Sequence, residues 1–76
     1  MDETVQFIYQ EIRNHNVNID GQINDIFTQA RLARLTPVIR NNFSAVIQQL
    51  TNEGILEERD NSHVLTELGF EMIYNQ

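Results

Sequence analysis

The side chains that most often do acid–base or metal chemistry are few in this chain and far apart. His15 and His63 are distant in the sequence, and neither has a second ligand at zinc-binding spacing. Glu57 and Glu58 could be mistaken for paired catalytic carboxylates, but neighbouring residues of a strand point to opposite faces. The sequence has no glycine-rich phosphate loop, no nucleophile motif and no cysteine. We therefore expect a protein that is not an enzyme, that holds no metal or cofactor, and whose histidines lie on the surface.

The charged residues are unevenly distributed along the chain. It carries 11 acidic residues and 5 basic ones, a formal net charge of −6, and every basic residue is an arginine. Residues 26–52 contain no Asp or Glu but include Arg31, Arg34 and Arg40. Non-specific binding to polyanions depends mainly on Lys and Arg, so the composition argues against it. What remains is a mildly basic segment within an acidic protein.

The length and the apolar segments bound the type of protein. A chain of 76 residues is expected to form one domain over residues 1–76. Its acidic start lacks the basic flank and apolar run of a signal peptide. No apolar stretch approaches the roughly 20 residues that span a membrane. We expect a cytoplasmic protein with no membrane contact.

The spacing of apolar residues predicts the elements of the first half of the chain. Residues 4–14 are expected to form a helix, with Asp2 or Thr4 capping its start. Residues 16–20 alternate apolar and polar side chains, which predicts a short strand. A second helix is expected from residue 22 to residue 31 or 34. These three patterns are carried by Val5, Ile8, Tyr9, Ile12, Val17, Ile19, Ile23, Ile26, Phe27 and Ala30.

A third helix has the clearest boundaries in the sequence. Thr36 is a good N-cap, and Pro37 suits the first helical position. The helix is expected to continue to about residue 52, and Gly54 can end it in a left-handed conformation. The side chains expected to face outward are Asn41, Ser44, Ala45 and Gln48. Those expected to be buried are Ile39, Phe43, Val46, Ile47 and Leu50.

The last third of the chain predicts a hairpin followed by a short helix. Residues 55–59 and 63–66 are expected to form two strands joined by a turn at residues 60–62. Residues 67–74 are expected to form the closing helix, capped by Thr66. Its inward side chains are expected to be Leu68, Met72 and Ile73.

Two segments resemble the winged helix-turn-helix family. Residues 50–57 (LTNEGILE) are similar to its L-x-x-x-G-(I/L)-(I/L) exit from the third helix, and residues 64–69 (VLTELG) to its (Y/V)-x-L-T-x-x-G return strand. Similar segments occur in MarR-like and PadR-like repressors and in the N-terminal winged helices of Mrr-like restriction proteins. The chain departs from the pattern by having no glycine between the second and third helices and about one extra turn at the start of the third. The resemblance implies an α+β fold with a three-helix core, a small antiparallel sheet and a short C-terminal helix.

The resemblance also implies a binding surface for double-stranded DNA. In the family the third helix enters the major groove, and the hairpin, or wing, approaches the backbone. The base-facing positions here would be Arg40, Asn41, Ser44, Ala45 and Gln48. Asn and Gln can bond adenine through two atoms, and Arg can do so with guanine. Phosphate contacts would come from Arg31, Arg34, Thr36 and Arg59.

Each assignment has an alternative. The polar face of the third helix could be solvated or could face a protein. Arg34 could pair with Glu53 or Asp25, and Arg59 could be a solvated charge within an otherwise acidic wing. The aromatic residues of the terminal helices, which could form a homodimer interface or pack in the core, are Phe7, Phe70 and Tyr74.

These observations leave three hypotheses. The first is a small DNA-binding transcriptional regulator, with the homodimer suited to palindromic sites. The second is a protein-interaction module that uses the acidic wing and the terminal helices. The third is an accessory part of a restriction or mobile-element system.

Overall fold

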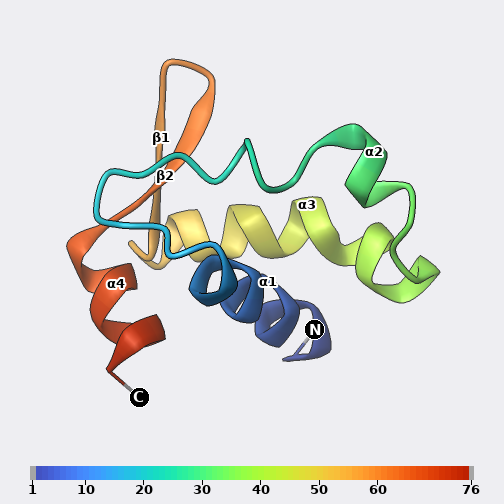
Figure 1. The fold of residues 1–76 in the computed structure, drawn as a ribbon, viewed down its shortest axis with the longest axis horizontal. Coiled ribbons are helices and arrows are strands. Elements are labelled where there is room, and N and C mark those ends of the chain that lie inside the picture. The colour runs from blue at the N-terminus through green and yellow to red at the C-terminus, as the bar shows by residue number, and fades with distance from the viewer. Residues whose placement is uncertain (1, 76) are drawn as a thin grey trace.

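The computed structural model of the chain describes residues 2–75, with only the backbone given for Asp2, Gln29 and Ala30. The elements are α1 (Asp2–Asn14), α2 (Gln29–Leu32), α3 (Pro37–Asn52), β1 (Leu56–Arg59), β2 (Ser62–Leu65) and α4 (Glu67–Tyr74). α1 crosses beneath α3, and the β1–β2 hairpin rises from the end of α3, far from α2 (Figure 1). The α+β arrangement with an antiparallel hairpin is therefore as predicted.

α1 carries the predicted apolar stripe. Ile8, Tyr9 and Ile12 are buried, and Val5 is half-buried. The helix already begins at Asp2, so Thr4 lies inside it and is fully buried. The prediction that Thr4 could cap the helix is therefore wrong, and the side chain of Asp2, the other predicted cap, lies outside the described residues. The Thr4 hydroxyl has no hydrogen-bond partner within the described part of the chain.

The strand predicted over residues 16–20 is wrong. Asn16 and Asp20 have φ angles of 54° and 65°, which lie outside the extended region. The segment that does pair with a strand comes later in the chain. Residues 20–23 run antiparallel beside β2 and bond to it through backbone N–H and C=O groups at 2.7–3.0 Å. This segment therefore covers one edge of the hairpin.

The second helix, predicted from residue 22, is reduced to the single turn of α2. Ile23 and Ile26 are buried as predicted, but a turn places them there, with the Ile26 amide donating to the Ile23 carbonyl at 3.1 Å. Between them, the Asn24 side chain accepts a 2.8 Å hydrogen bond from the His63 amide. This bond ties the segment to the hairpin.

α3 matches its predicted bounds. The Thr36 hydroxyl accepts a bond from the Ile39 amide at 3.5 Å, and Pro37 occupies the first turn. At the other end, Gly54 has a φ of 82°, and the amide that follows it bonds back to the Leu50 carbonyl at 2.9 Å. The inward face consists of Val46, Ile47 and Leu50, which are buried, and Ile39 and Phe43, which are half-buried.

The hairpin has a tighter turn than predicted. Arg59 pairs with Ser62, so the turn contains only Asp60 and Asn61, with φ angles of 50° and 66°. Two consecutive positive φ angles are typical of a type I′ turn, whose twist matches that of the strands. Leu56 and its partner across the strands, Leu65, are buried at the base of the hairpin.

α4 is capped as predicted but presents a different face to the core. The Thr66 hydroxyl accepts a 3.0 Å bond from the Gly69 amide. Ile73 is buried as predicted, whereas Leu68 and Met72 are 49% and 39% exposed, so their predicted inward orientation is wrong. The reason is Gly69, which packs so closely on the Ile55 carbonyl that a Cβ atom would overlap it.

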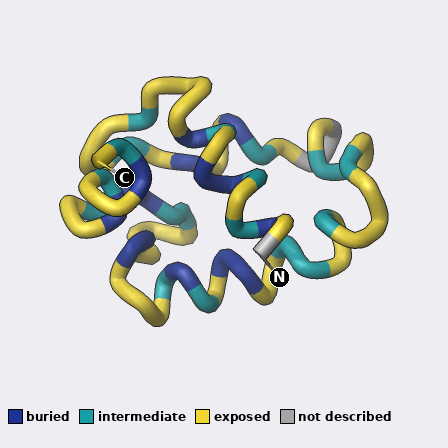
Figure 2. The backbone as a smooth tube through the Cα atoms, turned by 90° about the horizontal axis from the view of Figure 1, so that it is seen from below, coloured by how far each residue is buried: buried dark blue, intermediate teal, exposed yellow. Residues whose placement is uncertain are grey.

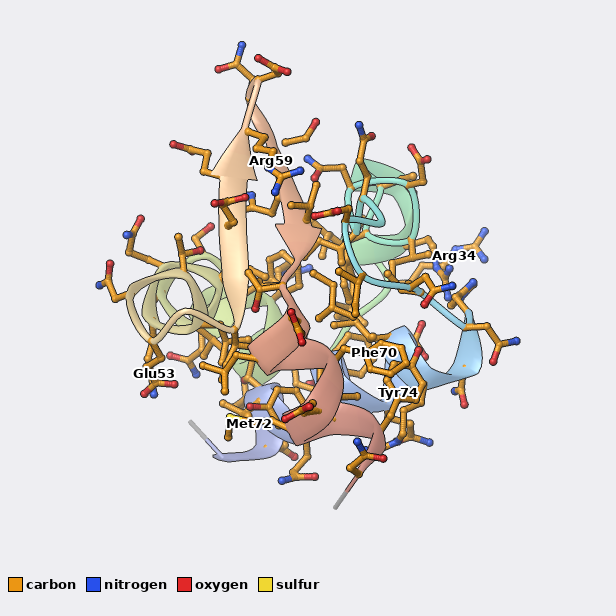
Figure 3. The ribbon with its side chains drawn as sticks, turned by 90° about the vertical axis from the view of Figure 1, so that its left-hand side faces the viewer. Arg34, Glu53, Arg59, Phe70, Met72 and Tyr74 are labelled. Carbon is orange, nitrogen blue, oxygen red and sulfur yellow. The ribbon has the colours of Figure 1, made fainter. Side chains whose placement is uncertain are left out.

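The aromatic residues of α4 pack within their own chain. The Phe70 and Tyr74 rings lie 4.5 Å apart on one side of α4, with Met72 on the other (Figure 3). The Tyr74 hydroxyl lies 2.9 Å from the Ile12 carbonyl oxygen and 2.8 Å from that of Val17. These contacts favour the alternative in which the terminal aromatic residues belong to the core.

The core forms where α1, α3, α4 and the base of the hairpin meet. Buried and exposed stretches alternate along the helices, as expected of amphipathic elements (Figure 2). Within residues 2–75, no helix is both long enough and apolar enough to cross a membrane.

Candidate functional site

The predicted outward face of α3 is exposed in the structure. Arg40, Asn41, Ser44, Ala45 and Gln48 are all exposed and recur at spacings of three and four along the helix. The helix contains no acidic residue. Because the opposite face is anchored in the core, this polar face is held on a rigid element of 16 residues.

Most of the polar groups on this face are available to a ligand. The side chains of Arg40, Asn41 and Ser44 form no hydrogen bond with other described side chains or backbone groups. Gln48 donates its amide to the Asn52 side chain at 3.1 Å, which leaves its carbonyl oxygen available. At the helix start, the Thr36 hydroxyl is already used as the N-cap, so its predicted phosphate contact would compete with that bond.

Two of the predicted phosphate-contacting arginines lie away from this face. Arg31 and Arg34 line a hollow of about 310 Å³ between α1 and residues 26–35. Arg31 forms a 2.8 Å ion pair with Glu11 and contacts the His15 ring at 3.2 Å, so its charge is largely compensated. Arg34 forms no ion pair with a carboxylate of residues 3–75, and neither of its two predicted partners is used.

Arg59 is neither a free cation nor simply solvated. Its guanidinium pairs with Glu57 on the same strand and with Asp20 at 3.1 Å. The hydrogen bond that Arg59 donates to the Glu57 carboxylate is the main reason that the pKa of Arg59 is raised. Arg59 lies against the hairpin in Figure 3, among acidic side chains that already balance it. The hairpin therefore presents mainly Glu58 and Asp60 as uncompensated charges.

A groove of about 260 Å³ separates α3 from the hairpin. Ser44 and Gln48 form its α3 rim, and Glu58 and His63 form its hairpin rim. Glu58 and His63 lie directly opposite each other in the strand register, so they share one face of the hairpin. The floor consists of Ile23, Phe27, Phe43 and Ile47, with Asn24 at the edge.

The polar groove residues that were not predicted as binding residues are Asn24, Glu58 and His63. Glu57 and Glu58 point to opposite faces of β1, as expected. The alternation of faces along β1 could have predicted the position of Glu58. Side chains two residues apart share a face of a strand, so Glu58 lies on the same face as the buried Leu56 and points toward α3. His63 is half-buried and not fully on the surface.

The two histidines lie in separate surroundings. His15 is beside Glu11 and Arg31, whereas His63 is in the groove. Within residues 2–75, no three His, Asp or Glu side chains converge as metal ligands would.

Comparison with protein-family models, with curated proteins and with solved structures finds no match to this chain.

Proposed function

We propose that this protein is a winged helix-turn-helix protein that binds double-stranded DNA and regulates transcription. The observation that carries the proposal is the exposed, acid-free face of α3, where Arg40, Asn41, Ser44 and Gln48 stand on a helix with a buried opposite face. An α-helix of this kind fits the major groove of B-DNA.

The order of the elements supports the winged-helix assignment. α3 follows the short helix α2 and ends at Gly54, directly before the hairpin. Residues 20–23 lie beside β2, where a third strand of a small sheet would run. α4 closes the chain beneath the hairpin (Figure 1).

The side chains of α3 have the chemistry needed to distinguish base pairs. Asn41 and Gln48 can each bond the N6 and N7 atoms of adenine, Arg40 can bond the O6 and N7 atoms of guanine, and Ser44 can bond either. Each good contact with two hydrogen bonds is worth about 1–3 kcal/mol of discrimination. Gln48 would exchange its exposed bond to Asn52 for such a contact.

The acidic wing sets the expected mode of binding. Glu58 and Asp60 would repel phosphates, and the charge of Arg59 is already paired within the hairpin. The wing is therefore expected to stand away from the DNA backbone and leave binding to α3. With few phosphate contacts, non-specific affinity should be low, and the slope of log affinity against log salt should be shallow.

Selection of sequences from a random duplex library at low salt tests this proposal. We expect an enriched motif, and Arg40→Gln and Gln48→Ala should each weaken binding to the selected duplex about tenfold, or ~1.4 kcal/mol. Gln10→Ala, at an exposed position of α1, is the control and should have no effect. The proposal fails if no motif is enriched, or if Arg40→Gln binds the selected duplex as tightly as the wild type.

A second candidate function is protein recognition through the wing. Its support is the pairing of Arg59 within the hairpin, which leaves Glu58 and Asp60 as a small acidic surface. The exposed apolar pair Leu68 and Met72 on α4 offers a further contact surface. This function predicts a stoichiometric protein partner, and the double variant Glu58→Gln/Asp60→Asn should no longer bind it. It also predicts that the protein does not bind duplex DNA at low salt.

A further inference from the structure

The groove between α3 and the hairpin has a rim rich in hydrogen-bond acceptors. The Glu58 carboxylate has only acceptor oxygens when ionised. One N–H of the Gln48 amide bonds to Asn52, and the Gln48 carbonyl oxygen accepts no bond from the described residues. The Ser44 hydroxyl can also accept. The Glu58 carboxylate and these acceptors favour a ligand that brings N–H donors.

The charge of the groove is set by Glu58. Its neighbour Glu57 lies on the other face of β1 and is paired with Arg59. Glu58 forms no ion pair within residues 3–75, and no arginine is among the described groove residues. His63 is the other titratable group that lines the groove. The groove thus favours a cation and disfavours an anion.

The floor of the groove is apolar and partly aromatic. The rings of Phe27 and Phe43 lie 5.0 Å apart at 59° to each other, and Ile23 and Ile47 complete the surface. At about 260 Å³ the space is just below the roughly 300–1,000 Å³ of typical ligand pockets. It therefore suits a small ligand with an apolar body.

We propose that this groove binds a small organic cation, an amidinium, guanidinium or ammonium on a compact apolar body. The charged head donates to the Glu58 carboxylate and to the Gln48 carbonyl, and the body covers Phe27 and Phe43. Such charge-assisted bonds are about twice as strong as neutral ones. The site does not depend on DNA binding, because none of its groups needs a nucleic acid to be in place.

Three ring compounds of nearly the same shape test the proposal: benzamidinium, benzamide and benzoate. Each is titrated into the ¹⁵N-labelled full chain at about pH 8, and amide chemical shifts are followed. We expect saturable shifts at residues 43–48 and 58–63, and an affinity for benzamidinium at least about tenfold above that for benzamide. Benzoate should not bind.

The adjacent glutamates supply a matched pair of variants. Glu58→Gln should reduce the affinity for benzamidinium about tenfold, to the level of benzamide. Glu57→Gln removes the same charge one residue away on the opposite face and should leave the affinity unchanged. The proposal is overturned if benzamidinium gives no localised shifts, if the three compounds bind alike, or if Glu57→Gln weakens binding as much as Glu58→Gln does.

Discussion

Residues 36–75 and residues 15–35 are held in place in different ways. In the first region, each junction between elements is fixed by a local motif, namely the Thr36 cap, the Gly54 turn, the two-residue turn of the hairpin and the Thr66 cap. In the second, the regular structure is limited to the four residues of α2 and a short pairing with β2. In this second region, hydrogen bonds to β2, which is distant in the sequence, hold the chain in place.

This difference matters because the two regions contribute different parts of the binding surface. The face of α3 belongs entirely to the firmly fixed region, so it is preorganised. The groove takes Asn24 and Phe27 from the second region, and Phe27 also borders the hollow that contains Arg34. The groove therefore draws its residues from both regions.

The largest expected effect tests how firmly α4 is packed. Gly69→Ala places a Cβ atom against the backbone carbonyl of Ile55, which cannot move without displacing the hairpin. We expect the free energy of unfolding, measured by urea denaturation, to fall by about 3 kcal/mol. Gly21→Ala is the matched variant in the second region, where the nearest atom is the Asn18 carbonyl oxygen at 2.9 Å. Because this overlap is smaller than that at Gly69, the free energy of unfolding should fall by only about 1 kcal/mol, and equal losses for the two variants would contradict the comparison.

The next largest effect concerns the two threonines that cap helices. The Thr66 hydroxyl accepts from the Gly69 amide and also contacts the Gly54 and Ile55 carbonyls, so Thr66→Ala should cost about 2 kcal/mol. Thr28 caps only the single turn of α2, through a 3.4 Å bond from the Arg31 amide. Thr28→Ala should therefore cost about 0.5 kcal/mol in the same denaturation experiment. A larger loss for Thr28→Ala than for Thr66→Ala would reverse the assignment of the two regions.

The same division explains which elements were predictable from the sequence. Thr36-Pro37, Gly54 and Thr66 act on residues within one helical turn, so their signals can be read locally, and α3 and α4 were placed correctly. The prediction of a second helix from residue 22 failed where the chain is held by bonds to β2. One of these is the bond between Asn24 and the His63 amide, 39 positions away. No local pattern contains that partner.

Errors in orientation have the same origin. Leu68 and Met72 have helical spacing, but the close approach of Gly69 to Ile55 turns the opposite side of α4 to the core. The outward face of α3 could be predicted because a full stripe of apolar residues defines its opposite side. The ion pairs of Arg31 with Glu11, and of Arg59 with Glu57 and Asp20, could not be predicted because composition does not identify partners.

A smaller effect tests the bond that ties the second region to the hairpin. Asn24→Ala leaves the His63 amide without its 2.8 Å acceptor and should cost about 1 kcal/mol. We expect hydrogen exchange to accelerate for the amides of residues 20–28, with little change in α3. Asn41→Ala, on the exposed face of α3, is the control and should leave exchange unchanged. If exchange accelerates equally throughout the chain, the two regions unfold as one unit and the comparison is wrong.

The smallest effect tests the link between α4 and the beginning of the second region. Burial raises the pKa of Tyr74 above its ordinary value of 10.0, and its hydroxyl proton is held by the carbonyls of Ile12 and Val17. The folded state therefore binds this proton more tightly than the unfolded state. This contribution to stability is complete below pH 10.0 and is lost as the pH rises through the folded-state pKa. The free energy of unfolding should fall with pH in this range.

Tyr9 must be separated from Tyr74 in that experiment, because burial and the charge of Glu53 also raise the pKa of Tyr9. Denaturation curves above neutral pH should show a shallower decline for Tyr74→Phe than for the wild type, since one titrating group is removed. Tyr9→Phe should retain the part of the decline that belongs to Tyr74. If the free energy of unfolding of Tyr74→Phe falls with pH as steeply as that of the wild type, the Tyr74 hydroxyl is not bonded to the Ile12 and Val17 carbonyls. In that case α4 does not stabilise the chain at the end of α1.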